Sequence, residues 1–125
     1  MKITKKILII EDELSLLQAL VDKFKMEKFL VVSAKNGKEG LELAKKEKPD
    51  LILLDIIMPI TDGITMLEQL RQDEWGKEVP VMVLTNLNDI EKTSEALKSG
   101  VRDYLVKTDW KLDDVVKKVK DKLSV

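Results

Sequence analysis

Five short apolar runs alternate along the chain with longer segments whose apolar residues recur at helical spacing. The runs are too short for helices and show little polar alternation, which is typical of strands buried on both faces of a parallel sheet. Strands are expected at residues 7–10, 30–34, 51–54, 81–84 and 104–106. The alternation therefore predicts an α/β fold in which helices cover both faces of a doubly wound parallel sheet, reached by right-handed crossovers.

The segments that follow these runs each place apolar side chains on one helical face. The faces comprise Leu14, Leu17, Val21 and Phe24, then Leu41 and Ala44, then Ile64, Leu67 and Leu70, then Ile90, Thr93 and Leu97, and finally Leu112, Val115, Val116, Val119 and Leu123. Turn-forming pairs such as Asn36-Gly37 and Asp62-Gly63 lie between strand and helix candidates. Each helix is expected to pack its apolar face against the sheet.

A chain of 125 residues fits one domain of ordinary size. No linker, repeat or low-complexity tract interrupts the pattern, and the last helical segment extends to Val125. We therefore expect a single domain over residues 1–125, without an output domain.

Cysteine and histidine are both absent from the sequence. Their absence excludes thiol nucleophiles, disulfides, imidazole bases and nearly every zinc or copper site, so any bound metal is expected to be a hard cation held by oxygen. The net charge of -1 gives no polybasic surface, and direct binding of nucleic acid is not expected. No apolar run approaches the ~20 residues that span a bilayer, and the N-terminus lacks a cleavage pattern, so the sequence predicts a cytoplasmic protein without a membrane partner.

Polar residues stand at the carboxyl ends of four expected strands. Glu11 and Asp12 follow the first strand, Asp55 the third, Thr85 the fourth and Lys107 the fifth. In an open α/β sheet, ligands bind beyond the carboxyl ends of the strands. These side chains, although far apart in the sequence, are therefore expected in one crevice.

Three converging carboxylates repel one another unless they are protonated or neutralised by a cation. Mg²⁺ is usually held by one or two carboxylates, water and phosphate oxygens, which suits Asp12 and Asp55, with Glu11 acting through a bound water. The stretch Glu11 to Glu13 could instead be only the acidic first turn of a helix, favoured by the helix dipole.

A carboxylate can also act as a nucleophile toward phosphorus, and this transfer needs neutralisation of charge more than it needs an acid or a base. Asp55 is the candidate acceptor. The metal would neutralise one side of the transferred group, Lys107 would supply a mobile cation, and the Thr85 hydroxyl would donate to a phosphoryl oxygen. Taken singly, Thr85 could be only a strand residue and Lys107 only a solvated one.

Six segments form a pattern that covers essentially the whole chain and is highly specific in this order and spacing. They are Ile7-Leu-Ile-Ile-Glu-Asp-Glu13, Pro49-Asp-Leu-Ile-Leu-Leu-Asp55, Met58-Pro-Ile-Thr-Asp-Gly63, Pro80-Val-Met-Val-Leu-Thr85, Ser99-Gly100 and Asp103-Tyr-Leu-Val-Lys107. The pattern resembles the CheY-like receiver domains of response regulators in two-component signal transduction. The resemblance implies a flavodoxin-like (βα)5 fold with five parallel strands in the order 2-1-3-4-5.

The resemblance also implies a phosphorelay function rather than an enzyme, with only self-phosphoryl transfer and autodephosphorylation as chemistry. Asp55 would accept the phosphoryl group from a sensor histidine kinase or a phosphotransfer protein. Mg²⁺, or Mn²⁺ in its place, would be held by Asp12, Asp55 and the backbone carbonyl of Ile57. Thr85 and Tyr104 would relay the change to a downstream protein through the surface of the fourth helix, fifth strand and fifth helix. Tyr104 could also be only a core aromatic, since either role places its ring against the sheet.

Two residues depart from the family pattern. Thr108 follows Lys107 where family members usually have proline with a cis peptide bond. A non-proline cis bond costs ~2.5–4 kcal/mol, so a trans bond is expected here, with an altered loop and an altered reach of Lys107. Asn86 occupies a position where a small residue is common, and it is expected to change the rate of dephosphorylation.

Three other functions fit parts of the sequence. A flavin mononucleotide site at the same sheet edge needs glycine or hydroxyl residues after the first strand, where this chain has Glu11 to Glu13. A phosphatase with an aspartyl nucleophile needs an acid two residues after Asp55, where this chain has Ile57. A receiver-like scaffold that binds a partner without phosphorylation remains the alternative.

Overall fold

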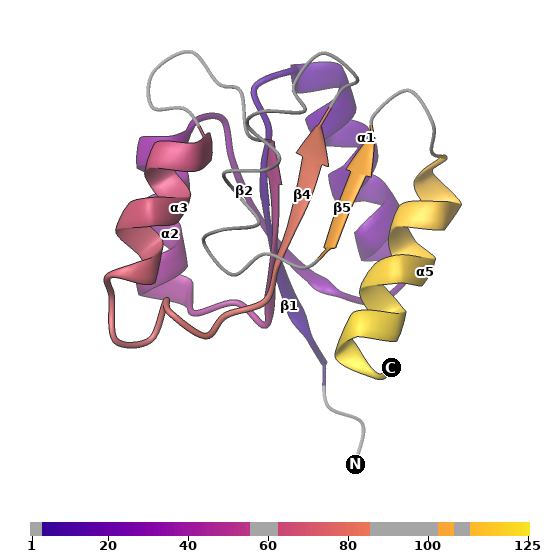
Figure 1. Ribbon diagram of the computed structural model, residues 1–125. Helices are drawn as coiled ribbons and strands as arrows, with labels where there is room; N and C mark the ends of the chain where they lie inside the picture. The colour runs from indigo at the N-terminus through magenta and orange to yellow at the C-terminus, as the bar shows by residue number, and fades with distance from the viewer. Residues whose placement is uncertain (1–3, 56–62, 86–102, 107–110) are drawn as a thin grey trace.

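The computed structural model describes residues 4–55, 63–85, 103–106 and 111–125, and the rest of the chain is drawn in grey in Figure 1. The strands are β1 (Lys6–Ile10), β2 (Leu30–Ala34), β3 (Leu51–Asp55), β4 (Val81–Thr85) and β5 (Asp103–Val106). They form one parallel sheet in the order β2-β1-β3-β4-β5. The predicted flavodoxin-like α/β fold and strand order are therefore confirmed.

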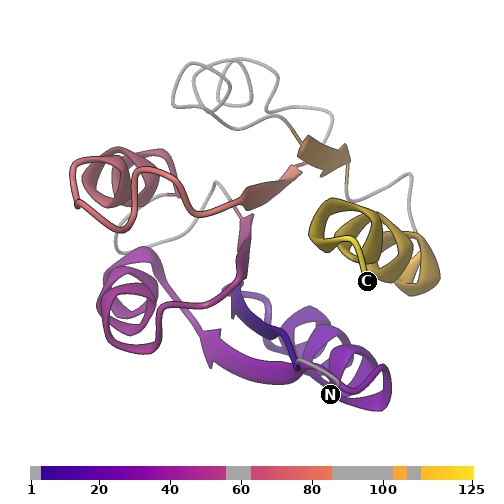
Figure 2. The ribbon, with the colours of Figure 1, turned by 90° about the horizontal axis from the view of Figure 1, so that it is seen from below.

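Helices cover both faces of this sheet, as Figure 2 shows in a view from below. They are α1 (Leu14–Met26), α2 (Gly37–Glu47), α3 (Gly63–Arg71) and α5 (Leu112–Leu123). The helices α1 and α5 lie together on one face, and α2 and α3 lie together on the other (Figure 2). The expected helical segment that contains Ile90, Thr93 and Leu97 falls outside the described residues.

Alternate residues of each central strand enter two different hydrophobic clusters. In β1, Leu8 and Ile10 pack in the cluster under α2 and α3, whereas Ile7 and Ile9 pack in the cluster under α1 and α5. All of β3 is buried, from Leu51 to Asp55. Burial on both faces explains the unbroken apolar runs, because a side chain on either side of such a strand is shielded from water.

Most of the predicted helix faces are in the core, with one exception. Leu17 and Phe24 are buried in α1, and the α3 and α5 faces are buried at their centres. The side chain of Leu14 is 61% exposed, so the expectation that it packs against the sheet with the rest of its face is wrong. Leu14 is the first residue of α1. At this point the chain has just left the edge of the sheet, and the helix does not yet lie against the strands. No helix within the described ranges is long and apolar enough to cross a membrane.

The ends of α2 follow from local chemistry. The Asn36 side chain accepts a hydrogen bond from the backbone N–H of Glu39 at 2.9 Å, which caps the first turn. At the other end, Lys48 adopts a left-handed conformation with φ of 45°, and Pro49 follows it. A proline cannot continue a helix, so the chain turns here into β3.

Ion pairs between side chains of alternating charge join α1 to α5. Lys23 Nζ lies 2.6 Å from Asp113 Oδ1 and 3.9 Å from Glu27 Oε2. Glu27 Oε1 accepts a hydrogen bond from Lys120 Nζ at 2.5 Å. The two ion pairs between the helices therefore bind α5 at its first turn and again near its last turn.

The hydrophobic cluster under α1 and α5 leads to a stability prediction at Phe24. This ring is fully buried and packs edge to face against Phe29, with ring centroids 5.4 Å apart. Phe24→Ala is expected to lower the free energy of unfolding by about 3–5 kcal/mol, because it leaves a cavity in the core. Chemical denaturation measures this change. Leu14→Ala, at an exposed position of the same helix, is the control and should stay within about 0.5 kcal/mol of the parent.

The ion pairs between α1 and α5 predict how the stability of the fold depends on pH. The hydrogen bond from Lys120 lowers the pKa of Glu27 below its ordinary value of 4.5, and the hydrogen bond from Lys23 lowers the pKa of Asp113. A lowered carboxyl pKa stabilises the fold above the unfolded-state pKa, and this stabilisation is lost as the pH falls through the folded-state value. The hydrogen bond to Asp113 raises the pKa of Lys23, so its stabilisation is lost only as the pH rises above 10.5.

Glu27→Gln is therefore expected to lower the Tm slightly at neutral pH and to have less effect as the pH falls below 4.5, because the pair is partly exposed to solvent. Thermal unfolding of the parent and the variant at about ten pH values between pH 3 and pH 8 measures this difference in Tm. Glu42→Gln, at an exposed position in α2, serves as the control. A Tm difference that stays constant across this range contradicts the assignment.

Candidate functional site

The pairing of β1 with β3 brings the first acidic residues together. Ile10 is level with Leu54 across this pair, so the next residues, Glu11 after β1 and Asp55 at the end of β3, lie at the same edge of the sheet. The backbone N–H of Glu11 also donates to the Ala34 carbonyl of β2 at 3.1 Å. Strands on both sides of β1 thus fix where the acidic turn begins.

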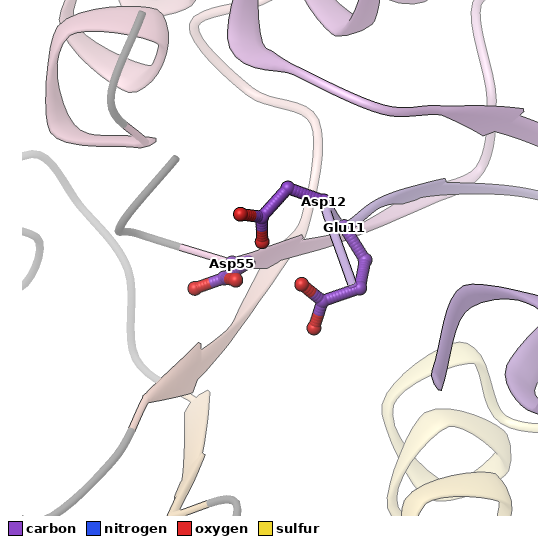
Figure 3. A group of neighbouring side chains, drawn as sticks. All are labelled: Glu11, Asp12 and Asp55. Atoms are coloured by element: carbon purple, nitrogen blue, oxygen red, sulfur yellow. The ribbon is translucent and has the colours of Figure 1, made fainter. Parts of the chain in front are cut away.

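The carboxylates of Glu11, Asp12 and Asp55 turn toward one another beyond this edge (Figure 3). One carboxylate oxygen from each residue lies within 4.8 Å of the other two. Glu11 is fully buried and Asp55 is 5% exposed, whereas Asp12 is exposed. The group therefore combines two shielded carboxylates with one that faces solvent.

The turn that carries Glu11 and Asp12 is not the first turn of a helix. α1 begins at Leu14, and no acidic residue lies in its first turn. The backbone N–H of Glu13 donates to Glu11 Oε2 at 3.3 Å, which holds the Glu11 side chain within the turn. Sequence reasoning did not find the backbone contacts of Glu11, because they depend on the neighbouring strand and on the local course of the chain.

The donor set fits a hard divalent cation. All three side chains offer carboxylate oxygen, the ligand type that Mg²⁺ and Mn²⁺ prefer. Burying two carboxylates beside a third is unfavourable without a compensating positive charge. The exposed position of Asp12 leaves the group open to solvent on that side, where water molecules can complete the coordination of a cation.

Thr85 and Tyr104 are placed by their strands. Thr85 ends β4 and pairs with Val106, and Tyr104 pairs with Val83, two residues earlier in β4. Thr85 therefore lies at the same sheet edge as Asp55, since Leu84 pairs with Asp55 itself. Lys107 directly follows Val106 in the sequence, but it lies outside the described residues. The same holds for three further predicted positions: Ile57, Asn86 and Thr108.

Comparison with known families identifies the family to which this fold belongs. The family model for the response regulator receiver domain matches residues 7–120. The chain belongs to this family. The match includes both the acidic edge of the sheet and α5, so the receiver domain accounts for nearly all of the described structure.

Curated relatives of the receiver domain include longer regulators. The probable transcriptional regulator ycf27 of Guillardia theta is 38% identical over 103 residues, which make up 82% of this chain and 39% of the relative. The probable C4-dicarboxylate response regulator DctR of Bacillus subtilis is 38% identical over 104 residues, which make up 82% of this chain and 45% of the relative. The receiver domain thus spans about two fifths of the length of these relatives.

Solved structures share the same fold over nearly the full chain. The chemotaxis protein CheY4 of Vibrio cholerae has a TM-score of 0.87 at 26% identity, with 95% of this chain and 98% of that chain covered. The receiver domain of the Francisella response regulator 1452 has a TM-score of 0.83 at 33% identity, with 94% of each chain covered. CheY in a CheX-CheY-BeF3-Mg²⁺ complex from Borrelia burgdorferi has a TM-score of 0.84 at 25% identity, covering 95% of this chain and 89% of that chain.

Membership in this family establishes the class of function. The protein is a receiver of two-component phosphorelay signalling, and the scaffold that works without phosphorylation is not favoured. Receiver domains bind Mg²⁺ at an acidic pocket and interact with histidine kinases and downstream effectors. Within the described ranges, Glu11, Asp12 and Asp55 form an acidic group that could hold a metal ion.

The repulsion among these carboxylates predicts opposite effects of one substitution with and without metal. Asp12→Asn is expected to raise the Tm in the absence of divalent cations, because it removes one charge from the group. The same variant should bind Mg²⁺ at least about tenfold more weakly, a loss of about 1.4 kcal/mol, and so gain less Tm from added Mg²⁺ than the parent. Thermal unfolding with a chelator and with a Mg²⁺ series measures both effects.

Asp121→Asn is the matched control for this experiment. Asp121 is exposed and lies in the last turns of α5, and the C-terminal end of this helix lies opposite the carboxyl ends of the strands (Figure 1). This variant should keep the Mg²⁺ response of the parent. An equal Mg²⁺ response in Asp12→Asn and Asp121→Asn would show that the acidic group does not bind the cation.

Proposed function

We propose that Asp55 accepts the phosphoryl group and that Glu11, Asp12 and Asp55, with the backbone carbonyl of Ile57, hold Mg²⁺ or Mn²⁺. The observation that supports this most is the meeting of the three carboxylates within 4.8 Å of one another at the carboxyl edge of the sheet. Asp55 ends the buried strand β3 and is only 5% exposed, which supports a restricted position for its carboxylate. A fixed nucleophile reduces the entropy that a transfer reaction loses on reaching its transition state.

The transfer itself needs little covalent chemistry from the protein. An oxygen of the Asp55 carboxylate supplies the electron pair for a new O–P bond. The P–N bond of a phosphohistidine on the donor breaks at the same time, and its electron pair returns to the imidazole. The product is an acyl phosphate on Asp55, and its later hydrolysis by water restores the carboxylate.

Charge is the main obstacle to this reaction, because a phosphoryl group approaches an acidic site. A divalent cation bound between Asp12 and Asp55 would neutralise part of this charge. Lys107 would add a second positive charge, and the Thr85 hydroxyl would donate a hydrogen bond to a phosphoryl oxygen. The strand register supports these roles, since Thr85 ends β4 beside Asp55 and Lys107 follows the end of β5.

The conformational change would pass from the site to the end of the sheet that β4 and β5 form. A phosphoryl group adds about -1.5 to -2 charges and strong acceptors, which would draw the Thr85 hydroxyl toward the site. Tyr104, two residues before the register partner of Thr85, would take up the space that this movement opens. Three parts of the chain would form the surface that binds the downstream protein: the segment that follows β4, the strand β5 and the helix α5. This surface would then bind better in one of the two states, phosphorylated or unphosphorylated, than in the other.

Intact-mass spectrometry with a small phosphodonor tests this proposal. The parent is expected to gain one phosphoryl group in the presence of Mg²⁺ but not in the presence of a chelator. Hydroxylamine should remove the group, because it attacks acyl phosphates and leaves phosphoserine and phosphothreonine intact. Asp55→Asn should not gain the group.

Asp121→Asn again provides the control, since it makes the same chemical change near the C-terminal end of α5. It should be phosphorylated like the parent. Thermal unfolding of Asp55→Asn verifies that the variant is folded. A hydroxylamine-labile phosphoryl group on folded Asp55→Asn would contradict the assignment of the acceptor.

A further inference from the structure

The strand β2 (Leu30–Ala34) stands at one end of the sheet order and pairs, among the described strands, with β1 alone. The helices α1 and α2 contact β2 from opposite faces of the sheet. Figure 2 shows β2 between these two helices, with no element of the described chain beyond it. The outer side of β2 is therefore a sheet edge that the described part of the chain leaves open.

The parallel register shows which backbone groups of β2 point toward this open side. The Leu30 N–H donates to the carbonyl of the residue before β1 at 2.9 Å, and the Ala34 carbonyl accepts from the residue after β1 at 3.1 Å. Alternate residues of a parallel strand form the hydrogen bonds to one neighbour, so Leu30, Val32 and Ala34 face β1. The N–H and C=O groups of Val31 and Ser33 therefore point away from the sheet.

The side chains of β2 offer apolar contacts on both sides of this edge. Leu30 is 53% exposed. Val31 is half-buried at the margin of the cluster under α1 and α5, and Val32 is half-buried at the margin of the cluster under α2 and α3. The strand contains no charged residue, proline or glycine, the usual means by which proteins protect a sheet edge from pairing. The edge therefore has the properties of a template for another strand.

Positive charges stand at both ends of β2. The segments just before and after the strand contain Lys28, Lys35 and Lys38, all of which are exposed. None of these lysines forms an ion pair with another described residue. Glu27 is already paired with a lysine of α5, and Glu39 is half-buried in the first turn of α2. The positive charge at each end of the edge is therefore left for a partner to neutralise.

The same charges disfavour pairing between two copies of this chain. An antiparallel pair of β2 strands would match the outward groups of Val31 and Ser33 between the copies. It would also bring Lys28 of one copy to the end at which Lys35 and Lys38 of the other lie. Like charges at such positions repel, and lysine beside an edge strand is a known means of preventing self-association. A strand with acidic ends meets attraction at both places instead.

We propose that the outer edge of β2 binds an extended segment of a partner protein, in which apolar and small polar residues alternate between acidic ends. The segment adds to the sheet as an antiparallel strand through the N–H and C=O groups of Val31 and Ser33. Its side chains cover Leu30 on one face and Val31 on the other, and its acidic ends meet Lys28 and Lys35. This edge is separate from the surface that includes β5 and α5, so the inference does not rest on the proposed phosphorylation.

Amide hydrogen exchange followed by NMR tests the edge directly. In the free protein, the N–H groups of Val31 and Ser33 should exchange at least about tenfold faster than those of Val32 and Ala34, which donate to β1. The probe is a terminally blocked peptide of alternating valine and threonine with aspartate residues at both ends. Its addition should slow exchange at Val31 and Ser33, because their N–H groups then donate to the peptide backbone.

Reversal of the flanking charges tests the choice of partner. A double variant with Lys28→Glu and Lys35→Glu is expected to bind the aspartate peptide at least about tenfold more weakly. The same variant should gain affinity for a matched peptide with lysine at both ends. The control variant carries Lys45→Glu and Lys117→Glu, which make the same change in net charge at exposed positions of α2 and α5. It should bind the aspartate peptide within about twofold of the parent.

Ser33→Pro tests the backbone contacts. It removes an outward N–H without removing a hydrogen bond to β1, and proline is tolerated in an edge strand where its nitrogen faces solvent. The variant is expected to bind the aspartate peptide about tenfold more weakly, since one hydrogen bond is lost and the proline ring obstructs the added strand. Ser33→Ala keeps the N–H and should bind like the parent. Thermal unfolding verifies that both variants are folded.

The proposal is overturned if the peptide leaves the exchange of Val31 and Ser33 unchanged, or if folded Ser33→Pro binds it as well as Ser33→Ala does. Equal binding of the aspartate and lysine peptides by the parent would also overturn it, because charge would then not select the partner. Slow exchange at Val31 and Ser33 in the free protein, together with a dimer in analytical ultracentrifugation, would assign the edge to a second copy of the chain instead.

Discussion

Pairing between β1 and β3 is the interaction on which the acidic site depends. These strands are apolar and buried from both sides, and their hydrogen bonds set a fixed register that makes Ile10 level with Leu54. A slip of one residue would exchange the faces of every side chain in the strand, so the two core clusters specify the register strongly. The hydrophobic core thus supplies the free energy that holds Glu11 and Asp55 close together, although their charges repel.

The cost of this arrangement is the physical reason to expect a cation at the site. Two shielded carboxylates and an exposed one oppose folding at neutral pH, and a divalent cation turns the same group into a set of ligands. Metal binding and the stability of this edge are therefore linked. Under the proposed function, an arriving phosphoryl group would add further negative charge, which the cation and Lys107 would partly neutralise.

The sequence predicted the parts of the structure that depend on local pattern. The strands at residues 7–10, 30–34 and 51–54 follow from short, mainly apolar runs, and Asp55 stands out because a carboxylate directly follows the run at 51–54. The assignment of Leu14 to the core was wrong, since periodicity places residues on a face but does not show where a helix starts to contact the sheet. The ion pairs of Lys23 and Lys120 were not predictable, because they join residues about ninety positions apart on surfaces with many lysines.

The sheet also divides the interior into two compartments that share only their backbone. Ile9 and Leu53 project toward α1 and α5, whereas Leu8 and Ile52 project toward α2 and α3. Substitutions in different compartments have few common neighbours, so their effects on stability are expected to add. One side of the molecule can therefore drift in sequence during evolution while the other stays unchanged. A new partner surface on α5 can arise in this way without any compensating change beneath α2 and α3.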